Sequence, residues 1–587
     1  MLNLLGILLS LVIAESTRGQ GIFVGWQSPV AAVIAVAIVL FLYNAVAANV
    51  VGRLQLLSLH ARAAAAQGMA EAPEIDRVSL AEREYFARRL PAFRLAADSV
   101  ILVLFYVLCS FFGWPDYVAQ YWHVPQHLDL LPNLLPYLGM LAASWVGQFR
   151  LEHELRGPSW RPGAFVAFHT RANLMTLAPI LIINALYWAL LTWVPLAGEL
   201  REAFAYLDFA LQLLLVLVVS VFLPPLVRLV IPSEPLPPGP LRDRLEAFAR
   251  ARGIRVGRLL VWRTNSRFFA TAFVIGLVGP LRYVFFTDAI LRRLSADELE
   301  AVLAHELGHA HHRHLWWLLV FLLSFSVLLL AVDELVRMTG SIESQFAGVA
   351  LALAYGYFAF GYLSRRFERQ ADAFAARHTS PELISSVLLR IGAGNPAAMR
   401  KTGWRHFSIS QRVRELALLR HHPEVQARFD GERRKAMGLV AAVTLLAALL
   451  LAQPVRKDVV SGLATLSLAR FDRARVAGDT AGMNELRQRT LDRIDAMGRL
   501  DDDYNRMARW YEGVVQGLSG EQTPALDQLA AEVRRKRDET QDSRERQTCD
   551  RWLALVEATE VSMKRAREKG VPFDDELDAE LARRGLK

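Results

Sequence analysis

The stretch His305-Glu-Leu-Gly-His309 has the residue types and the spacing of a metal centre. Residues four apart lie on one face of a helix, so His305 and His309 can present ring nitrogens to a single ion. The H-E-x-x-H pattern favours zinc, and Glu306 can take a proton from a water on that ion. A catalytic zinc also needs a third protein ligand, so the residue that supplies it decides the class of enzyme.

A second segment, Ser364–Asp372, carries two carboxylates four residues apart. On a helix Glu368 and Asp372 share a face, and Glu368 can complete a site of two histidines and one glutamate. Asp372 can accept the second ring N–H of a ligand histidine, with an ordinary exposed carboxylate as the alternative. A metzincin would have a third histidine soon after the motif, and that pattern does not fit. We therefore expect a glutamate-type zinc site.

The composition is that of a membrane protein. Hydrophobic residues make up 53% of the 587 residues, and the mean hydropathy is +0.24, which is unusual for a soluble protein. The net charge is +9, but the arginines mostly flank apolar runs, as orientation signals of membrane proteins do, so we expect no nucleic-acid partner. Cys109 and Cys549 alone give neither a disulfide framework nor a thiolate metal site.

Apolar runs of bilayer length divide the chain into four regions. Residues 1–231 are expected to form an N-terminal membrane region of about five spans, preceded by the short apolar segment Leu2–Ala14, which we interpret as an uncleaved anchor rather than a signal peptide. The expected regions that follow are a zinc protease domain at 232–436 with two spans, a last span at 437–453 and a helical domain at 454–587. The expected spans are Pro29–Val51, Asp98–Gly113, Leu130–Val146, Asn173–Leu196, Phe209–Ile231, Leu315–Val332, Phe346–Leu363 and Met437–Ala452.

The charges between these spans predict the orientation. The connection Trp114–Asp129 has neither lysine nor arginine, whereas Gly52–Ala97 is rich in arginine and the basic run Arg433–Lys435 precedes the last span. Basic connections stay in the cytoplasm, so the protease site is expected there and residues 454–587 outside. The Ala-, Arg- and Leu-rich, Lys-poor usage indicates a bacterial inner membrane.

The expected protease region mixes helices and strands. Ile231–Pro240 is rich in proline and predicts a stiff, extended linker. Leu241–Ala251 then has helical spacing. The segments expected as strands are Leu259–Trp262, Phe268–Val278 and Leu281–Phe286.

The metal helix has a clear start. Ser295 as N-cap, with Glu298 three residues later, forms a capping-box pattern. His311, His312 and His314 extend the motif beyond the metal ligands, and we expect all three to lie at the membrane interface.

At these residues the chain resembles the membrane zinc metalloproteases that include the type I CAAX prenyl endopeptidases and the heat-shock protease HtpX, a gluzincin group. The resemblance covers about Ser233–Leu416. It rests on His305–His309, Ser364–Asp372, Leu236–Leu241, Thr287–Ala289 and His406-Phe-Ser-Ile-Ser-Gln-Arg412. It implies one zinc ion bound by His305, His309 and Glu368, Glu306 as general base, and His406 as stabiliser of the oxyanion.

Two departures from the family pattern concern the substrate. Thr271-Ala272-Phe273 stands where the family commonly has an Asn-Ala-Phe-type element, and Phe407 replaces a proline. We expect Thr271, Ala272 and Phe273 to contact the substrate, which would lie extended along this strand. Arg412 is the fourth residue that we assign to substrate binding.

Together these patterns predict a mainly α polytopic membrane protein with a gluzincin-type α+β zinc protease domain and a C-terminal α-helical extramembrane domain. The expected activity is hydrolysis of peptide bonds by zinc-activated water, in membrane-associated or misfolded membrane proteins. The partners would be a peptide or protein substrate, the lipid bilayer and a protein bound by the C-terminal domain. Two alternatives stay open: CAAX-type processing of prenylated C-termini, and a catalytically silent membrane scaffold.

Overall fold

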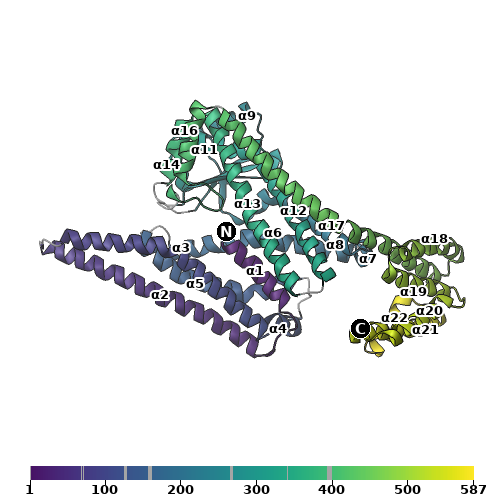
Figure 1. Ribbon diagram of the computed structural model, residues 1–587. Coiled ribbons are helices and arrows are strands. Elements are labelled where there is room, and N and C mark those ends of the chain that lie inside the picture. The colour runs from purple at the N-terminus through teal and green to yellow at the C-terminus, as the bar shows by residue number, and fades with distance from the viewer. Residues whose placement is uncertain are drawn as a thin grey trace. The chain divides into compact units, whose positions relative to one another are not determined.

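The computed structural model divides the chain into two compact units. One comprises Met1–Trp188, Leu214–Ser326 and Val349–Val443, and the other Ala189–Leu213, Val327–Gly348 and Thr444–Lys587. Helices dominate both units (Figure 1). The residues that the structure describes are 2–67, 69, 72–123, 128–156, 161–264, 269–339, 342–392, 399–422 and 424–586.

The described part of the chain contains seven helices long and apolar enough to cross a membrane, as an integral membrane protein requires. Seven of the eight expected spans fall within or overlap these helices. The eighth, Phe346–Leu363, lies in α13 (Ile342–His378), which is not among the seven. The seven helices are α2 (Gln27–Ala66), α3 (Ala72–Ser110), α5 (Leu130–Arg156), α6 (Pro162–Trp193), α8 (Ala205–Val230), α12 (His314–Thr339) and α17 (Glu424–Val476).

The N-terminal helices pack around a buried apolar core. Helices α1 (Leu2–Ser16) and α4 (Trp114–Tyr121) join α2, α3 and α5 there. The helix α2 runs beyond the expected span because the residues after Val51 are mostly alanine, leucine, glutamine and arginine, which favour a helix. The largest fully buried side chains of this core include Phe105, Leu134 and Met140.

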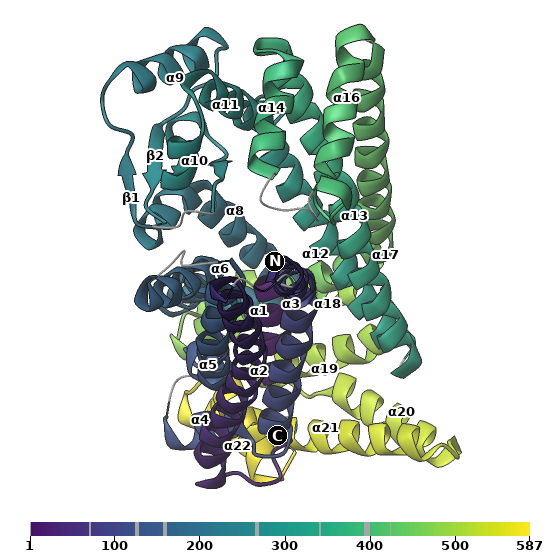
Figure 2. The same cartoon turned by 90° about the vertical axis from the view of Figure 1, so that its left-hand side faces the viewer.

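A four-stranded sheet lies at the centre of the protease region. Its order is β1-β2-β4-β3, with β2 and β4 parallel and the other pairs antiparallel. Figure 2 shows β1 and β2 beside the helices of this region. The edge strand β3 therefore has one side without a neighbouring strand. The strands are β1 (Ser233–Pro235), β2 (Arg258–Trp262), β3 (Ala272–Ile275) and β4 (Tyr283–Thr287), with the 3-10 turn Gly279–Leu281 before β4.

The sheet differs from its prediction at two strands. Strand β1 lies in the expected linker, where proline keeps the chain extended and is tolerated at a sheet edge. Strand β3 is shorter than Phe268–Val278 because Gly276 has a φ of +119° and ends the extended run. The first residue of that expected strand, Phe268, lies outside the described residues. Strands β2 and β4 overlap the expected segments, with β4 starting two residues later than expected because Leu281 belongs to the 3-10 turn.

Helices pack on the sheet through a buried cluster that includes Leu245, Phe286 and Leu303. The predicted helix start is confirmed, because Ser295 and Glu298 form both hydrogen bonds of a capping box at the first turn of α11. The contacts of the buried cluster pack α11 against the sheet. The helices of this region besides α12 and α13 are α9 (Pro240–Ala251), α10 (Asp288–Arg293), α11 (Ala296–His311), α14 (Pro381–Gly392) and α16 (Ile409–His421).

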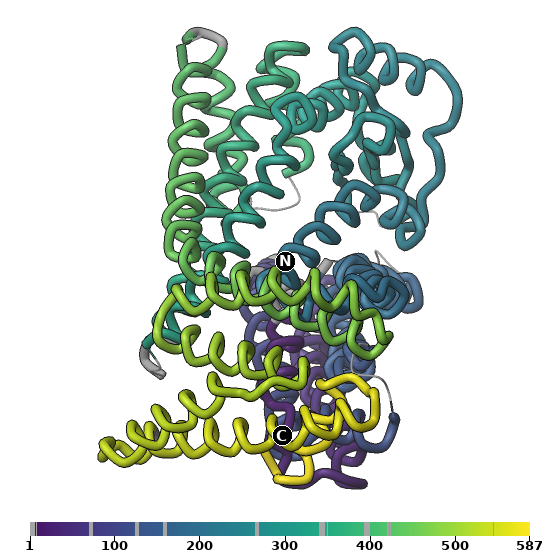
Figure 3. Tube along the Cα trace, turned by 90° about the vertical axis from the view of Figure 1, so that its right-hand side faces the viewer, coloured from purple at the N-terminus to yellow at the C-terminus, as the bar shows by residue number. Residues whose placement is uncertain are grey.

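The second unit is entirely helical in its described residues. Helix α17 passes residue 454 without a break, and Pro454 lies inside it. Successive helices then lie side by side (Figure 3) around a core that includes Phe471, Met497 and Leu526. The helices, after α7 (Pro195–Ala203), are α18 (Thr480–Gly498), α19 (Asp502–Leu518), α20 (Pro524–Glu539), α21 (Ser543–Lys569) and α22 (Phe573–Arg583).

Candidate active site

Two helices bring the three candidate metal ligands together. His305 and His309 lie on α11 and Glu368 lies on α13. The distance from His305 Nε2 to Glu368 Oε2 is 3.7 Å, and from His309 Nε2 to Glu368 Oε1 it is 3.6 Å. Zinc bonds of about 2.0–2.1 Å put the ligand atoms of a tetrahedral site about 3.4 Å apart. The donor set therefore fits one zinc ion.

Gly308 allows the two helices to approach this closely. A Cβ at Gly308 would lie 2.9 Å from the Cα of Ala371 and 3.2 Å from its carbonyl oxygen. Any side chain there would push α13 away from α11. The glycine inside the motif thus sets the distance at which Glu368 meets the two histidines.

Asp372 holds the ring of His305. Its Oδ1 lies 3.0 Å from His305 Nδ1, which leaves Nε2 of the ring directed at Glu368. Arg412 donates to both carboxylate oxygens of Asp372, from Nε at 2.7 Å and from Nη2 at 2.6 Å. Burial alone would raise the pKa of Asp372, but Arg412 and His305 outweigh it and hold that pKa below its usual range. An ionised Asp372 is suited to fix the ring orientation.

His309 is in contact with His314, a histidine that the sequence analysis assigns to the membrane interface. The Nδ1 atoms of His309 and His314 lie 2.9 Å apart, and His314 is only 1% exposed. Arg313, between α11 and α12, has a φ of +56°, a left-handed turn that redirects the chain. We expected His311, His312 and His314 at the membrane interface; the structure instead places His314 against a metal-ligand candidate.

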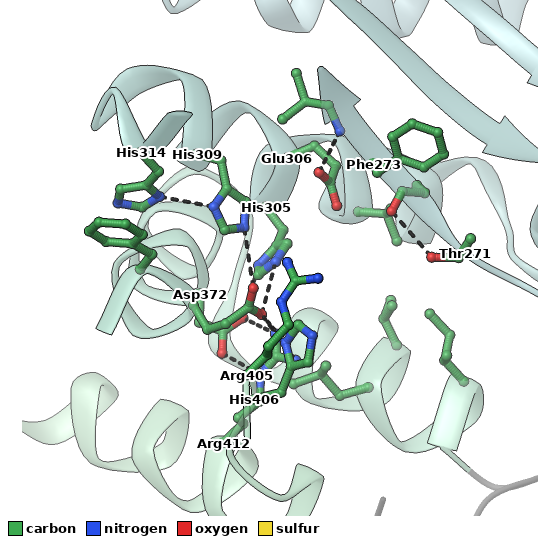
Figure 4. Close-up of a pocket in the computed structure, with 18 of the residues that line it drawn as sticks. Thr271, Phe273, His305, Glu306, His309, His314, Asp372, Arg405, His406 and Arg412 are labelled. Atoms are coloured by element: carbon green, nitrogen blue, oxygen red, sulfur yellow. Dashed lines mark hydrogen bonds and ion pairs between the residues drawn. The ribbon is translucent and has the colours of Figure 1, made fainter. Parts of the chain in front are cut away.

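Glu306 points from α11 toward the edge strand. Its Oε2 accepts a hydrogen bond from the backbone N–H of Val274 on β3 at 2.9 Å (Figure 4). Burial raises the pKa of Glu306 to about 7, against the opposing effect of His305. A carboxylate with this pKa can take up and release a proton near neutral pH, as a general base must.

His406 lies beside the third ligand candidate on a loop of its own. Its Nδ1 is 3.1 Å from Glu368 Oε2, while 53% of its side chain is exposed. The loop is fixed to α13 through Trp404, whose indole N–H donates to the carbonyl oxygen of Tyr357 at 2.7 Å. Arg365 donates to the carbonyl oxygen of Trp404, also at 2.7 Å. His406 is therefore held at the site and is still open to a substrate.

Arg412 lies against the carboxylates of the site. Besides its two bonds to Asp372, its Nη1 lies 3.6 Å from Glu368 Oε2, and 12% of its side chain is exposed. Burial raises the pKa of Glu368, but the hydrogen bond from His406 and the charge of Arg412 lower it well below the usual range. Glu368 is thus ionised, as a metal ligand must be. The assignment of Arg412 to substrate binding stays a prediction.

Thr271, Ala272 and Phe273 lie along the edge strand beside the site. With the metal-ligand candidates and apolar side chains of α14 they line a cavity of about 360 Å³. The N–H of Thr271 donates to Thr287 Oγ1 at 3.0 Å, and its hydroxyl donates to the carbonyl oxygen of Ala272 at 3.3 Å. The ring of Phe273 stacks on Phe285. All three residues line the cavity that a substrate would enter.

Three groups at the site were missed by sequence reasoning. They are the backbone N–H of Val274, the side chain of Gln370, whose Oε1 lies 3.1 Å from His314 Nε2, and Asp430, which accepts a hydrogen bond from Gln370. A backbone donor has no sequence signature, and no motif connects Gln370 with Asp430. Only the packing of the helices brings these groups to the site.

Residues 241–431 match Peptidase family M48, so the chain contains a domain of this family. The resemblance inferred from the motifs is thereby confirmed. The match spans both helices that carry the metal-ligand candidates, and His406.

Curated relatives carry two kinds of name. A "CAAX prenyl protease 1 homolog" of Oryza sativa subsp. japonica is 26% identical over 230 residues, which are 36% of this chain and 53% of the relative. A "Protease HtpX homolog" of Aeropyrum pernix is 34% identical over 136 residues, 23% of this chain and 41% of the relative. The chain thus spans about half the length of the curated relatives it matches. Among solved structures, that of S. mikatae Ste24p aligns with a TM-score of 0.41 and 19% identity, covering 65% of this chain and 98% of that chain.

Proposed function

We propose that the protein is an integral-membrane zinc metalloendopeptidase. The observation that carries the proposal is the convergence of His305, His309 and Glu368 on one point, with the carboxylate of Glu306 beside them. The M48 domain supports the same conclusion, because that family consists of peptidases.

The residues of the site divide the chemistry among them. His305, His309 and Glu368 would hold zinc, which supplies a Lewis acid for hydrolysis when bound. Glu306 takes a proton from the attacking water at its carboxylate and can pass it to the leaving amine. The imidazolium form of His406 has two N–H donors, one for Glu368 and one for the oxygen of the scissile carbonyl.

The edge strand offers backbone groups to an extended substrate. Thr287 N–H donates to the carbonyl oxygen of Thr271 at 3.0 Å, and this backbone hydrogen bond continues the β3–β4 register one residue before β3 begins. Ala272 pairs with Phe286 in the next, non-bonded position. The backbone groups of Ala272 therefore face the open edge, where an added strand can bind with little regard to sequence.

The proposed substrates are membrane-associated or misfolded membrane proteins. Processing of prenylated C-termini is the second candidate, and the relatives named CAAX prenyl protease 1 favour it, while those named HtpX protease favour the first. Incubation with a prenylated peptide and, in parallel, with an unfolded membrane protein separates the two. Selective cleavage of the prenylated peptide would overturn the broader assignment.

We place the site on the cytoplasmic side of a bacterial inner membrane, and residues 454–587 outside, where they would bind a protein partner. The charge alternation between the spans supports this orientation. Reporter fusions after residue 423 and after residue 586 should report opposite sides. The same side for both would contradict the proposed topology.

The substitution Glu306→Gln tests the proposed activity. The amide cannot act as a base, so turnover should fall roughly 10²–10⁴-fold, while one zinc ion stays bound because the three ligand candidates are intact. Glu300→Gln, on the same helix but paired with Arg244, is the matched control and should keep full activity. Unchanged proteolysis in Glu306→Gln, or no zinc in the wild-type protein, would refute the proposal and favour a silent scaffold.

A further inference from the structure

His309 is connected to a carboxylate through two buried side chains. Its Nδ1 lies 2.9 Å from Nδ1 of His314, and Nε2 of His314 lies 3.1 Å from Oε1 of Gln370. The amide of Gln370 in turn donates to Asp430 Oδ1. His314 and Gln370 are 1% and 0% exposed, so the contact between these two side chains is shielded from water.

The carboxylate of Asp430 sets the donor and the acceptor in each of these hydrogen bonds. Asp430 can only accept when ionised, so Gln370 donates through its NH₂ group and presents its carbonyl oxygen to His314. His314 must then carry its proton on Nε2, which leaves Nδ1 as an acceptor. The remaining contact requires His309 to donate from Nδ1, and that tautomer leaves Nε2 free to bind a metal.

Four elements must assemble to build this connection. His309 comes from α11, His314 from the start of α12, Gln370 from α13 and Asp430 from α17. The ring of His314 also stacks on Phe367, with centroids 4.3 Å apart and an interplanar angle of 13°. The ring is thus fixed in two independent ways. The left-handed turn at Arg313 brings His314 to His309, whereas Gln370 and Asp430 reach the site from two other helices.

We propose that His314, Gln370 and Asp430 are positioning residues that orient His309 for zinc. The inference rests on the proposed function and deepens it. His305 reaches its carboxylate, Asp372, directly at 3.0 Å, whereas His309 reaches Asp430 through two intermediaries. Both histidines are then held with Nε2 toward Glu368, and the polar contact at Nδ1 of each ring makes it a stronger ligand.

The variant His314→Phe tests this proposal. Phenylalanine keeps a ring that can stack on Phe367 but gives His309 Nδ1 no acceptor. Zinc affinity, measured by competition with a chelating dye, should fall roughly 10–100-fold, and the visible spectrum of the cobalt-substituted protein should change. His312→Phe is the matched control, because His312 stacks on His314 but lies outside the connection. An affinity of His314→Phe within twofold of the wild type would overturn the proposal.

A second pair of variants tests the direction of the hydrogen bonds. These variants also test the positioning role if His314→Phe does not fold. Gln370→Glu places two carboxylates in contact and should weaken zinc binding. Adding Asp430→Asn restores a donor, so the double variant should recover zinc affinity to within about threefold of the wild type, roughly the energy of a partial hydrogen bond. No recovery in a folded double variant contradicts the connection. Zinc-free wild-type protein would instead refute the proposed function itself.

Discussion

Oε2 of Glu306 accepts a hydrogen bond from the N–H of Val274 at 2.9 Å. The candidate general base is thus tied to the edge strand along which we propose that the substrate lies. The strand fixes the carboxylate from one side, and α11, which carries Glu306 together with His305 and His309, fixes it from the other. Binding of a peptide to the edge strand and positioning of the base therefore depend on the same backbone.

The edge strand gives a prediction at Ala272. Proline there removes the N–H that faces the open edge and leaves the hydrogen-bonded pairs at Thr271 and Phe273 intact. The KM for a peptide should rise about fivefold, the effect of about 1 kcal/mol for one lost hydrogen bond, with zinc content unchanged. Ala272→Val keeps the N–H and controls for bulk. Equal KM values for the two variants would exclude the backbone contact.

The pH dependence of turnover should reflect Glu306. Only the ionised carboxylate is a base, so kcat/KM falls as the pH drops below its pKa, by tenfold per pH unit. Burial raises this pKa to about 7, and the positive charge of a bound zinc favours the carboxylate and lowers it again. The acid limb of a pH profile should therefore lie between 4.5 and 7, where 4.5 is the ordinary value for this group. A flat profile down to pH 4 would exclude Glu306 as the base.

Arg412 should be essential for stability. It pairs with Asp372 and lies near Glu368, so Arg412→Met leaves buried carboxylates without their cation, at a cost of about 3–5 kcal/mol. Arg412→Lys keeps the charge but cannot make both bonds to Asp372. Its stability should lie between that of the wild type and that of Arg412→Met. Unfolding of the zinc-free protein in detergent measures the difference. Arg414→Met, on an exposed position of α16, should have no effect; a similar loss there would show that the helix, not the ion pair, is sensitive.

The core of the site could be predicted because its residues follow local rules. His305, Glu306 and His309 have helical spacing after a capping box, and Glu368 and Asp372 have the same spacing on a later helix. Between the two motifs lie the apolar segments that carry the chain away from the site and back to it. His314 could not be predicted, because it reaches His309 only through the left-handed turn at Arg313. Arginine rarely adopts that backbone conformation, so the sequence carries no sign of the turn.

The fold was predictable where periodicity was strong and less so at boundaries. Helix α9 and strands β2 and β4 lie where the pattern put them, whereas β1 depends on pairing with β2, a tertiary contact. The boundary expected before Pro454 lies inside α17. A proline removes one helical hydrogen bond, but the helix formers on both sides continue the helix through it.

The position of His406 depends on the missing side chain at Gly361. A Cβ on Gly361 would lie 2.7 Å from Nε1 of Trp404 and 3.0 Å from its carbonyl oxygen, so the indole is seated where α13 has no side chain. The loop that carries His406 is anchored at this point, two residues before the histidine.

Gly361→Ala should therefore displace Trp404 and move His406 away from Glu368. Turnover should fall roughly 10–100-fold, as for a misplacement of about 1 Å, while zinc content stays the same because the metal-ligand candidates are untouched. Gly356→Ala on the same helix, where the atoms nearest to a Cβ belong to the ring edge of Phe325, is the control. Full activity in Gly361→Ala, with a melting temperature equal to that of the control, would show that neither the anchor nor His406 contributes to turnover.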